Sequence, residues 1–359
     1  VCNLLALRDL TGKDAFLDQA RLLVDRVHHV LGRHRGDDGR TGWISGLSET
    51  DGEGHPTRGG LRIGKKGIER RVDEPFDERS EWDRDGQYFH YLTKWMQALN
   101  RMTLATGETT WNDWALELAE SAHRAFTYRR PDGGLAMYWK MSVDLSRPLV
   151  PSMGQHDALD GFVTYHRLEA TRSADSAGPT LAPLLRELGH LCEARTWATG
   201  DELGIGGLLT EAAHMVQLIA AGSTDLEGLL NDVLGAAQQS LRVQATQHRL
   251  DQPAPTRLAF RELGLAIGLQ AVPPMRAAIA AHLERFDHSD ALIMRVDALA
   301  RHCPLVDRIE RFWTDPDNQR SVTWTDHLDI NAVMLATCLV PHVYLGVDPE
   351  WTGDADTLG

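Results

Sequence analysis

Apolar residues recur at helical spacing along almost the whole chain of 359 residues, and no run alternates in the way that a half-buried strand would. In segment 87–105, for example, Phe89, Leu92 and Met96 fall on one helical face, and the pattern stops at Gly107, a residue suited to a left-handed C-cap. The same reasoning predicts twelve helices, over residues 16–32, 87–105, 110–127, 156–171, 179–198, 202–221, 225–247, 256–271, 273–287, 289–301, 304–315 and 326–340. An all-α fold without strands is therefore expected.

The connections between these helices have two lengths. Links such as 106–109 and 199–201 are short, which is typical of antiparallel neighbours. Two others, 33–86 and 128–155, are far longer than the loops of a compact domain usually are. Both precede an even-numbered helix in the predicted series. We therefore expect a single domain over residues 1–359, built from six helical hairpins, with both long loops on one rim.

The composition limits the kinds of partner that we expect this protein to bind. Acidic residues outnumber basic ones by 51 to 37, and a net charge of −14 disfavours nucleic acids and anionic membrane surfaces. The cysteines are scattered, with no paired spacing and no clustered histidines, so neither a zinc site nor a disulfide framework is indicated. They are Cys2, Cys192, Cys303 and Cys338. We predict no metal and no cofactor.

No leader pattern and no apolar stretch of about 18 residues is evident, so the sequence predicts a cytoplasmic protein that does not enter a membrane. The sequence does not specify an oligomeric state.

Three predicted helices begin with the same mixture of side chains. Acids, histidines and aromatic residues gather in "EWDRDGQYFHYLTKW" (81–95), "SMGQHDALDGFVTYHRL" (152–168) and "TWTDHLDINA" (323–332). Acids in a first turn stabilise a helix by themselves, and for any one helix this simple explanation suffices. Taken together, the three openings predict a cavity lined with carboxylates, imidazoles and ring faces. Sugar recognition needs such a lining, because ring faces stack on a pyranose while polar groups orient its hydroxyls.

Paired helices with long loops on one rim resemble the (α/α)6 toroid of the six-hairpin glycosidase superfamily, which also includes sugar epimerases and lyases. The unsaturated-uronide hydrolases of that superfamily begin an inner helix with His-Asp-x-Gly-Phe, and this chain has His156-Asp157 followed by Gly161-Phe162. The spacing departs from the family pattern, because three residues, 158–160, stand where one is expected. The resemblance implies that Asp157 donates the proton, with Asp160, directly before Gly161, as an equal claimant.

The candidate site residues follow from these openings and from the loops beside them. Asp157 and Asp326 are the principal candidate carboxylates. The alternates are Asp85, Asp160 and Glu81, with His156 beside them. The candidate substrate-binding residues are Trp82, His90, Lys94, Tyr138, Trp139, Trp324, His327, Asp329 and Arg58. Arg58 lies in the basic stretch 57–71, whose arginines suit an anionic sugar, although a solvated loop that neutralises nearby acids is the more frequent explanation of such a stretch.

Two classes of function remain. The favoured class is a carbohydrate-active enzyme acting on a small-molecule or oligosaccharide substrate. It would be a glycoside hydrolase with paired acid and base carboxylates, or an epimerase or lyase in which a histidine shuttles the proton. The other class is a non-catalytic helical scaffold or binding protein, in which the acids only cap helices. Nucleophile elbows, metalloprotease motifs and dinucleotide fingerprints are missing; the glycines of "DELGIGGLL" (201–209) lie within a helical pattern that no strand precedes.

Overall fold

The computed structural model describes residues 1–193, 195–223, 225–247 and 249–348. Its contacts divide the chain into two compact units. The first unit contains Val1 and Asp14–Ala194, and the second contains Cys2–Lys13 and Arg195–Gly359. The second unit is therefore discontinuous in sequence, because Cys2–Lys13 precedes most of the first unit and Arg195–Gly359 follows it.

The first unit consists of seven helices and two small sheets in its described part. The helices are α2 (Ala15–Leu31), α3 (Glu49–Gly54), α4 (Glu78–Asp83), α5 (Phe89–Thr106), α6 (Thr110–Phe126), α7 (Asp157–Ala170) and α8 (Ala182–Cys192). The strands are β1 (Gln87–Tyr88), β2 (Thr127–Arg129), β3 (Leu135–Met137), β4 (Lys140–Met141) and β5 (Pro148–Val150). They pair antiparallel, in the order β1-β4-β5 and as the hairpin β2-β3.

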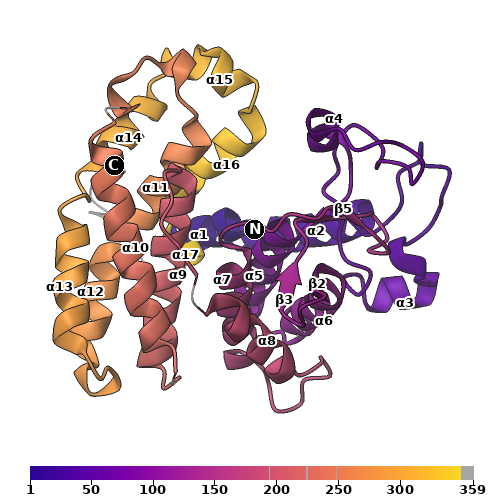
Figure 1. The fold of residues 1–359 in the computed structure, drawn as a ribbon, viewed down its shortest axis with the longest axis horizontal. Helices are drawn as coiled ribbons and strands as arrows, with labels where there is room; N and C mark the ends of the chain where they lie inside the picture. Colours follow the sequence, from indigo (N-terminus) through magenta and orange to yellow (C-terminus); the bar gives the residue numbers. More distant parts are fainter. Residues whose placement is uncertain (194, 224, 248, 349–359) are drawn as a thin grey trace. The chain divides into compact units, whose positions relative to one another are not determined.

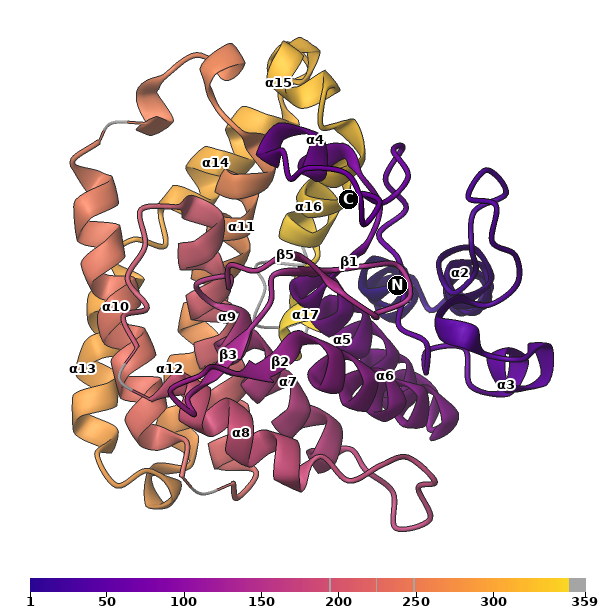
Figure 2. The ribbon, with the colours of Figure 1, turned by 45° about the vertical axis from the view of Figure 1, so that its right-hand side comes forward.

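Helices α5 and α7 run parallel in the first unit. Thr93 and Lys94 of α5 contact Asp160, and Gln97, one turn further on, contacts Thr164. These pairs lie 66 or 67 positions apart in sequence, so both chains advance in the same direction. Figures 1 and 2 show the two helices side by side. Their N-termini consequently lie at the same end of the unit.

The second unit is entirely helical in the residues that the structure describes. Its α-helices are α1 (Cys2–Thr11), α9 (Glu202–Ala220), α10 (Glu227–Ala245), α11 (Ala259–Gln270), α12 (Val272–Ala281), α13 (Ser289–Ala300), α14 (Leu305–Thr314), α15 (Val322–Thr325), α16 (Leu328–Leu339) and α17 (His342–Leu345). Helix α1 packs against α16 and α17, and Asn3 of α1 donates to the carbonyl of Val333 in α16 at 3.3 Å. Figure 2 shows α9 and α10 beside α12 and α13.

Parallel helices also form the core of the second unit. Arg261 of α11 pairs with Asp201, directly before α9, and the amide of Phe260 donates to Asn331 of α16 at 2.9 Å. At the other end of α11, Gln270 donates to the carbonyl of Cys338 at 2.9 Å. Helices α9, α11 and α16 therefore begin at a common end of this unit.

Each of the twelve predicted helices corresponds to an observed helix, and the predicted all-α class is confirmed. The largest boundary error is at 179–198, where α8 covers only Ala182–Cys192 and residue 194 lies outside the described residues. The expectation of no strands was wrong: short strands occupy much of loop 128–155. Their length of two or three residues is too short for alternation to be detected. Loop 33–86 likewise contains α3 and α4, which the periodicity did not predict.

Within the described residues, two helical stretches are long and apolar enough to cross a membrane, by length and composition only. They are Glu202–Ala220 and Ala259–Ala281, and 72% and 67% of their apolar windows are buried within the protein. The sequence analysis expected no such stretch. Core helices of a globular unit have this same pattern, and the cytoplasmic location stays a prediction.

Candidate functional site

The first candidate site lies where α5 and α7 begin. Asp157 and Asp160 are the first and fourth residues of α7, and both side chains are at most 10% exposed. An Asp157 oxygen accepts the Gly154 amide at 3.2 Å. A Cβ on Gly154 would come within 2.4 Å of that oxygen, so a larger residue at 154 would displace the Asp157 carboxylate. We call Asp157, Asp160, His90, Lys94 and Trp139 the α5–α7 site.

Asp160 is held by α5. Thr93 Oγ1 donates to one carboxylate oxygen at 2.6 Å, and Lys94 Nζ donates to the other at 2.8 Å. Gln97 reaches the same carboxylate at 3.5 Å. Hydrogen bonds and a cation stabilise the anionic form of a carboxyl group. The contacts thus fix Asp160 as an oriented carboxylate.

His90 stands between the carboxylates and a group of aromatic rings. Its Nδ1 lies 3.9 Å from Asp157 Oδ1, and its ring stacks on Trp139 with centroids 6.4 Å apart. Although 34% of the side-chain surface is exposed, the ring lies deep among its neighbours, and this burial lowers the pKa of His90 to about 4. The Asp160 charge opposes that shift and Lys94 reinforces it. At neutral pH the imidazole is therefore uncharged.

An aromatic cavity of about 300 Å³ adjoins His90 through Tyr88 and Trp139. Tyr88 lies 5.4 Å from the His90 ring and 5.3 Å from Trp139, and Trp82 meets Trp139 edge-on at 4.7 Å. The cavity is lined by Phe76, Glu78, Glu81, Trp82, Tyr88, Trp139, Val150, Pro151 and Ser152. Phe76 and Trp82 remain 53% and 44% exposed, so ring faces are accessible to a ligand.

Glu81 makes structural contacts under this cavity. Its carboxylate binds Lys140 Nζ at 3.0 Å and Arg70 Nε at 2.9 Å, and Lys140 also donates to the carbonyls of Glu81 and Arg84. Burial lowers the pKa of Lys140, and the Glu81 carboxylate opposes the shift. Both Glu81 oxygens are thereby engaged, which is the geometry of an anchor for α4 rather than of a proton donor.

The other candidates from the first unit lie outside this group. Asp85 is fully buried; it accepts from Arg62 at 3.0 Å and from the amides of Gly64 and Gly86. Arg58 donates to Glu117 of α6 at 2.8 Å. Tyr138 stacks on Tyr128 at 4.2 Å, beside the β2-β3 hairpin. His156 directly precedes α7 and makes no cap hydrogen bond through its side chain.

The basic stretch 57–71 is neutralised within its own unit. Besides Arg58, three of its arginines pair with carboxylates: Arg62 with Asp85, Arg70 with Glu81 and Arg71 with Asp73. These pairs support the simpler explanation of the stretch and leave less positive charge for a substrate.

The candidates around residue 326 belong to the second unit. Asp326, His327 and Asp329 are exposed, whereas Trp324 is only 4% exposed and stacks on Trp313 at 5.7 Å. Trp324 therefore has the contacts of a core residue rather than of a sugar platform. Asp157 belongs to the first unit and Asp326 to the second, and the pairing of these two carboxylates stays a prediction.

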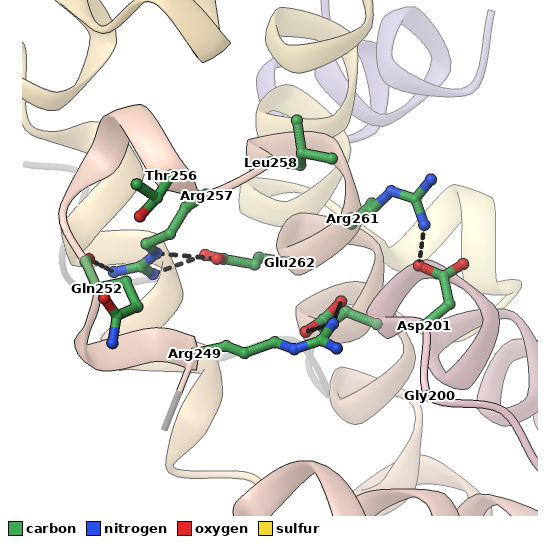
Figure 3. A pocket seen from close by; sticks show the side chains of 10 residues that line it. Gly200, Asp201, Arg249, Gln252, Thr256, Arg257, Leu258, Arg261 and Glu262 are labelled. Atoms are coloured by element: carbon green, nitrogen blue, oxygen red, sulfur yellow. Dashed lines mark hydrogen bonds and ion pairs between the residues drawn. The ribbon is translucent and has the colours of Figure 1, made fainter. Parts of the chain in front are cut away.

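Sequence reasoning missed Tyr88, Thr93 and Gln97 at the α5–α7 site. For Thr93 and Gln97 the sequence does contain a signal. Residues three and four apart share a helix face, and positions 90, 93, 94 and 97 form such a face of α5. It also missed a cavity of about 530 Å³ in the second unit, where Asp201 and Glu202 open α9 and Arg261 and Glu262 lie in the first turn of α11 (Figure 3). Asp201 also caps the N-terminus of α9, where its carboxylate accepts from the Gly204 amide at 3.2 Å.

Among the described residues, no group of three or more histidine, cysteine, aspartate or glutamate side chains is arranged to hold a metal ion. Comparison with models of known protein families, with characterised proteins and with solved structures gave no match. Any function must therefore be argued from the geometry of the sites themselves.

Proposed function

We propose that this protein is a carbohydrate-active enzyme, a glycoside hydrolase in which Asp157 is the proton-donating carboxyl. One observation carries the proposal: the Asp157–Asp160 pair at the start of α7 lies beside His90, which in turn stacks on the Trp139 ring of an aromatic cavity. Ring faces would hold the sugar, and the carboxyls would act on the bond next to it.

The parallel helices support the proposed (α/α)6 toroid. In such a ring, the inner helices run in one direction and present their first turns at one rim. Helices α5 and α7 of the first unit meet this condition, as do α9, α11 and α16 of the second.

The state of His90 favours hydrolysis over a histidine proton shuttle. A general acid or base works best when its pKa lies near the working pH, and the pKa of His90 is about 4. A neutral imidazole instead suits a hydrogen bond to a sugar hydroxyl. The epimerase or lyase therefore ranks second, and a non-catalytic sugar-binding scaffold ranks third.

Hydrolysis of alkyl glycosides, whose leaving group must be protonated as it departs, tests this proposal. Neutral and uronic-acid glycosides would be offered to the wild type, to Asp157→Asn, and to Asp132→Asn as a matched control on an exposed turn. We expect release of the alcohol by the wild type and the control, and a loss of about 100-fold or more in Asp157→Asn. Turnover that is unchanged in Asp157→Asn would overturn the role of Asp157, and binding without turnover would favour the scaffold.

A further inference from the structure

The cavity of about 530 Å³ in the second unit falls in the size range of ligand sites. The first turns of α9 and α11 and the segment between α10 and α11 build it (Figure 3). The lining residues are Gly200, Asp201, Glu202, Arg249, Gln252, Thr256, Arg257, Leu258, Arg261 and Glu262. We call it the α9–α11 cavity.

Glycines set the distance between the two helices. A Cβ on Gly206 of α9 would come within 2.0 Å of the Gly264 carbonyl oxygen, and one on Gly268 would come within 2.4 Å of the Gly206 oxygen. The backbones therefore touch just below the cavity. This contact keeps the charged first turns of α9 and α11 side by side.

One arginine lies in the cavity wall with its hydrogen-bonding groups already paired. Arg257, 4% exposed, binds both oxygens of Glu262 at 2.9 and 2.6 Å and donates to the Leu250 carbonyl at 2.9 Å. Its guanidinium also lies 3.5 Å above the Phe312 ring, and Trp313 donates to Glu262 at 2.8 Å. These groups satisfy one another, so they shape the cavity without offering free bonds.

The other two arginines keep donors to spare. Arg249, with 50% side-chain exposure, uses one nitrogen for long contacts of 3.3 and 3.5 Å to Glu202. Arg261, with 41% exposure, uses one nitrogen on Asp201, and its Nε has no hydrogen-bond partner among the described residues. A guanidinium has five N–H donors. The Glu202 carboxylate, only 7% exposed, has no shorter contact in the described part of the chain than those to Arg249.

The charges in the lining balance. Three arginines face Asp201, Glu202 and Glu262, so neither an anion nor a cation gains from net attraction. A hydroxyl group both donates and accepts, and it can bridge a carboxylate and a guanidinium without disturbing their charge. A ligand with hydroxyls on neighbouring carbons would suit this lining, because the Glu202 carboxylate and the Arg249 guanidinium lie next to each other.

We propose that the α9–α11 cavity binds a neutral polyhydroxylated ligand, a sugar or an alditol. A ligand hydroxyl donates to Glu202 and accepts from Arg249, while Arg261 binds a second hydroxyl. The site uses none of the α5–α7 residues, so the inference goes beyond the proposed hydrolysis and does not depend on it.

Calorimetric titration of the full chain tests this inference. The probes are neutral hexoses and hexitols, with inorganic phosphate as the anion. The variants are Glu202→Gln and Arg249→Met, and the matched control is Arg276→Met, whose guanidinium pairs with Asp297 on the surface. We expect the wild type and the control to bind a neutral probe, and each cavity variant to lose about tenfold or more in affinity.

Three results would overturn the inference. They are unchanged affinity in both cavity variants, preferential binding of phosphate, and no binding of any neutral probe by the folded wild type. Thermal unfolding of each variant verifies that it is folded, and the half-exposed Arg249 gives a reading even if Glu202→Gln is unstable. Glu202 and Arg249 lie outside the α5–α7 site, so a loss of affinity in their variants separates this inference from the proposed hydrolysis.

Discussion

The α5–α7 site and the α9–α11 cavity use the same construction to different ends. In each, acidic residues at the start of one helix contact side chains near the start of a parallel helix. At the α5–α7 site the acids lie beside an uncharged imidazole and exposed rings. In the α9–α11 cavity each acid is paired with an arginine. The difference shows that carboxylates at the same place on a helix can have different neighbours, and our two proposals, proton transfer at one site and ligand binding at the other, depend on those neighbours.

The largest loss of stability is expected when the buried ion pair in the wall of the α9–α11 cavity is broken. Arg257→Met would leave the Glu262 charge buried without its guanidinium and should lower the free energy of unfolding by about 3–5 kcal/mol. Urea denaturation measures the change. A loss under about 1 kcal/mol would show that the pair does not hold the cavity wall.

The contact between α9 and α11 gives the next largest effect. Gly206→Ala forces a Cβ against the Gly264 carbonyl and should cost about 1–3 kcal/mol. Gly207, the adjacent residue, has nothing within 4 Å of an added Cβ, so Gly207→Ala should stabilise α9 by about 0.5–1 kcal/mol. Thermal unfolding of the pair compares them directly. Equal melting temperatures would contradict the close packing that forms the cavity.

Acidic pH should weaken the contact between α2 and α5. His28 of α2 accepts from Trp95 of α5 at 3.0 Å, and burial, with a smaller contribution from His29, lowers the pKa of His28 to about 3. The unfolded chain binds this proton near pH 6.5. The free energy of unfolding should therefore fall as pH drops from about 6.5 toward 3, by at most about 1.4 kcal/mol per pH unit.

A matched pair of variants isolates this contribution. His28→Gln keeps an acceptor for Trp95 but does not titrate, so its stability should depend less on pH than that of the wild type. His190→Gln, at an exposed position on α8, serves as the control. Identical pH dependence in both variants would remove His28 as the cause.

The smallest effect is expected at Lys94. Its pair with Asp160 is 41% exposed on the lysine side, and such pairs contribute about 0–1 kcal/mol. Lys94→Met should thus leave the free energy of unfolding nearly unchanged in urea denaturation. A loss as large as that of Arg257→Met would erase the energetic contrast between the two sites.

The sequence predicted the helices well and the sites only in part. Periodicity located α5 and α7, and the acids at their starts marked the α5–α7 site. It could not show that Asp85 and Glu81 pair with Arg62, Arg70 and Lys140. The path of loop 33–86 brings the two arginines to these acids, and Lys140 comes from β4, 59 positions from Glu81. The α9–α11 cavity was missed for a related reason. Asp201 and Arg261 are 60 positions apart, and only the packing of Gly206 on Gly264 brings them together.

Kinetics of Asp157→Asn on a hydrolysed glycoside test the central claim most directly. If Asp157 donates the proton, kcat should fall by about 100-fold or more while KM stays within about twofold, because asparagine preserves the shape and the Gly154 contact. A raised KM with an unchanged kcat would contradict the claim and reduce Asp157 to a residue that only binds the sugar.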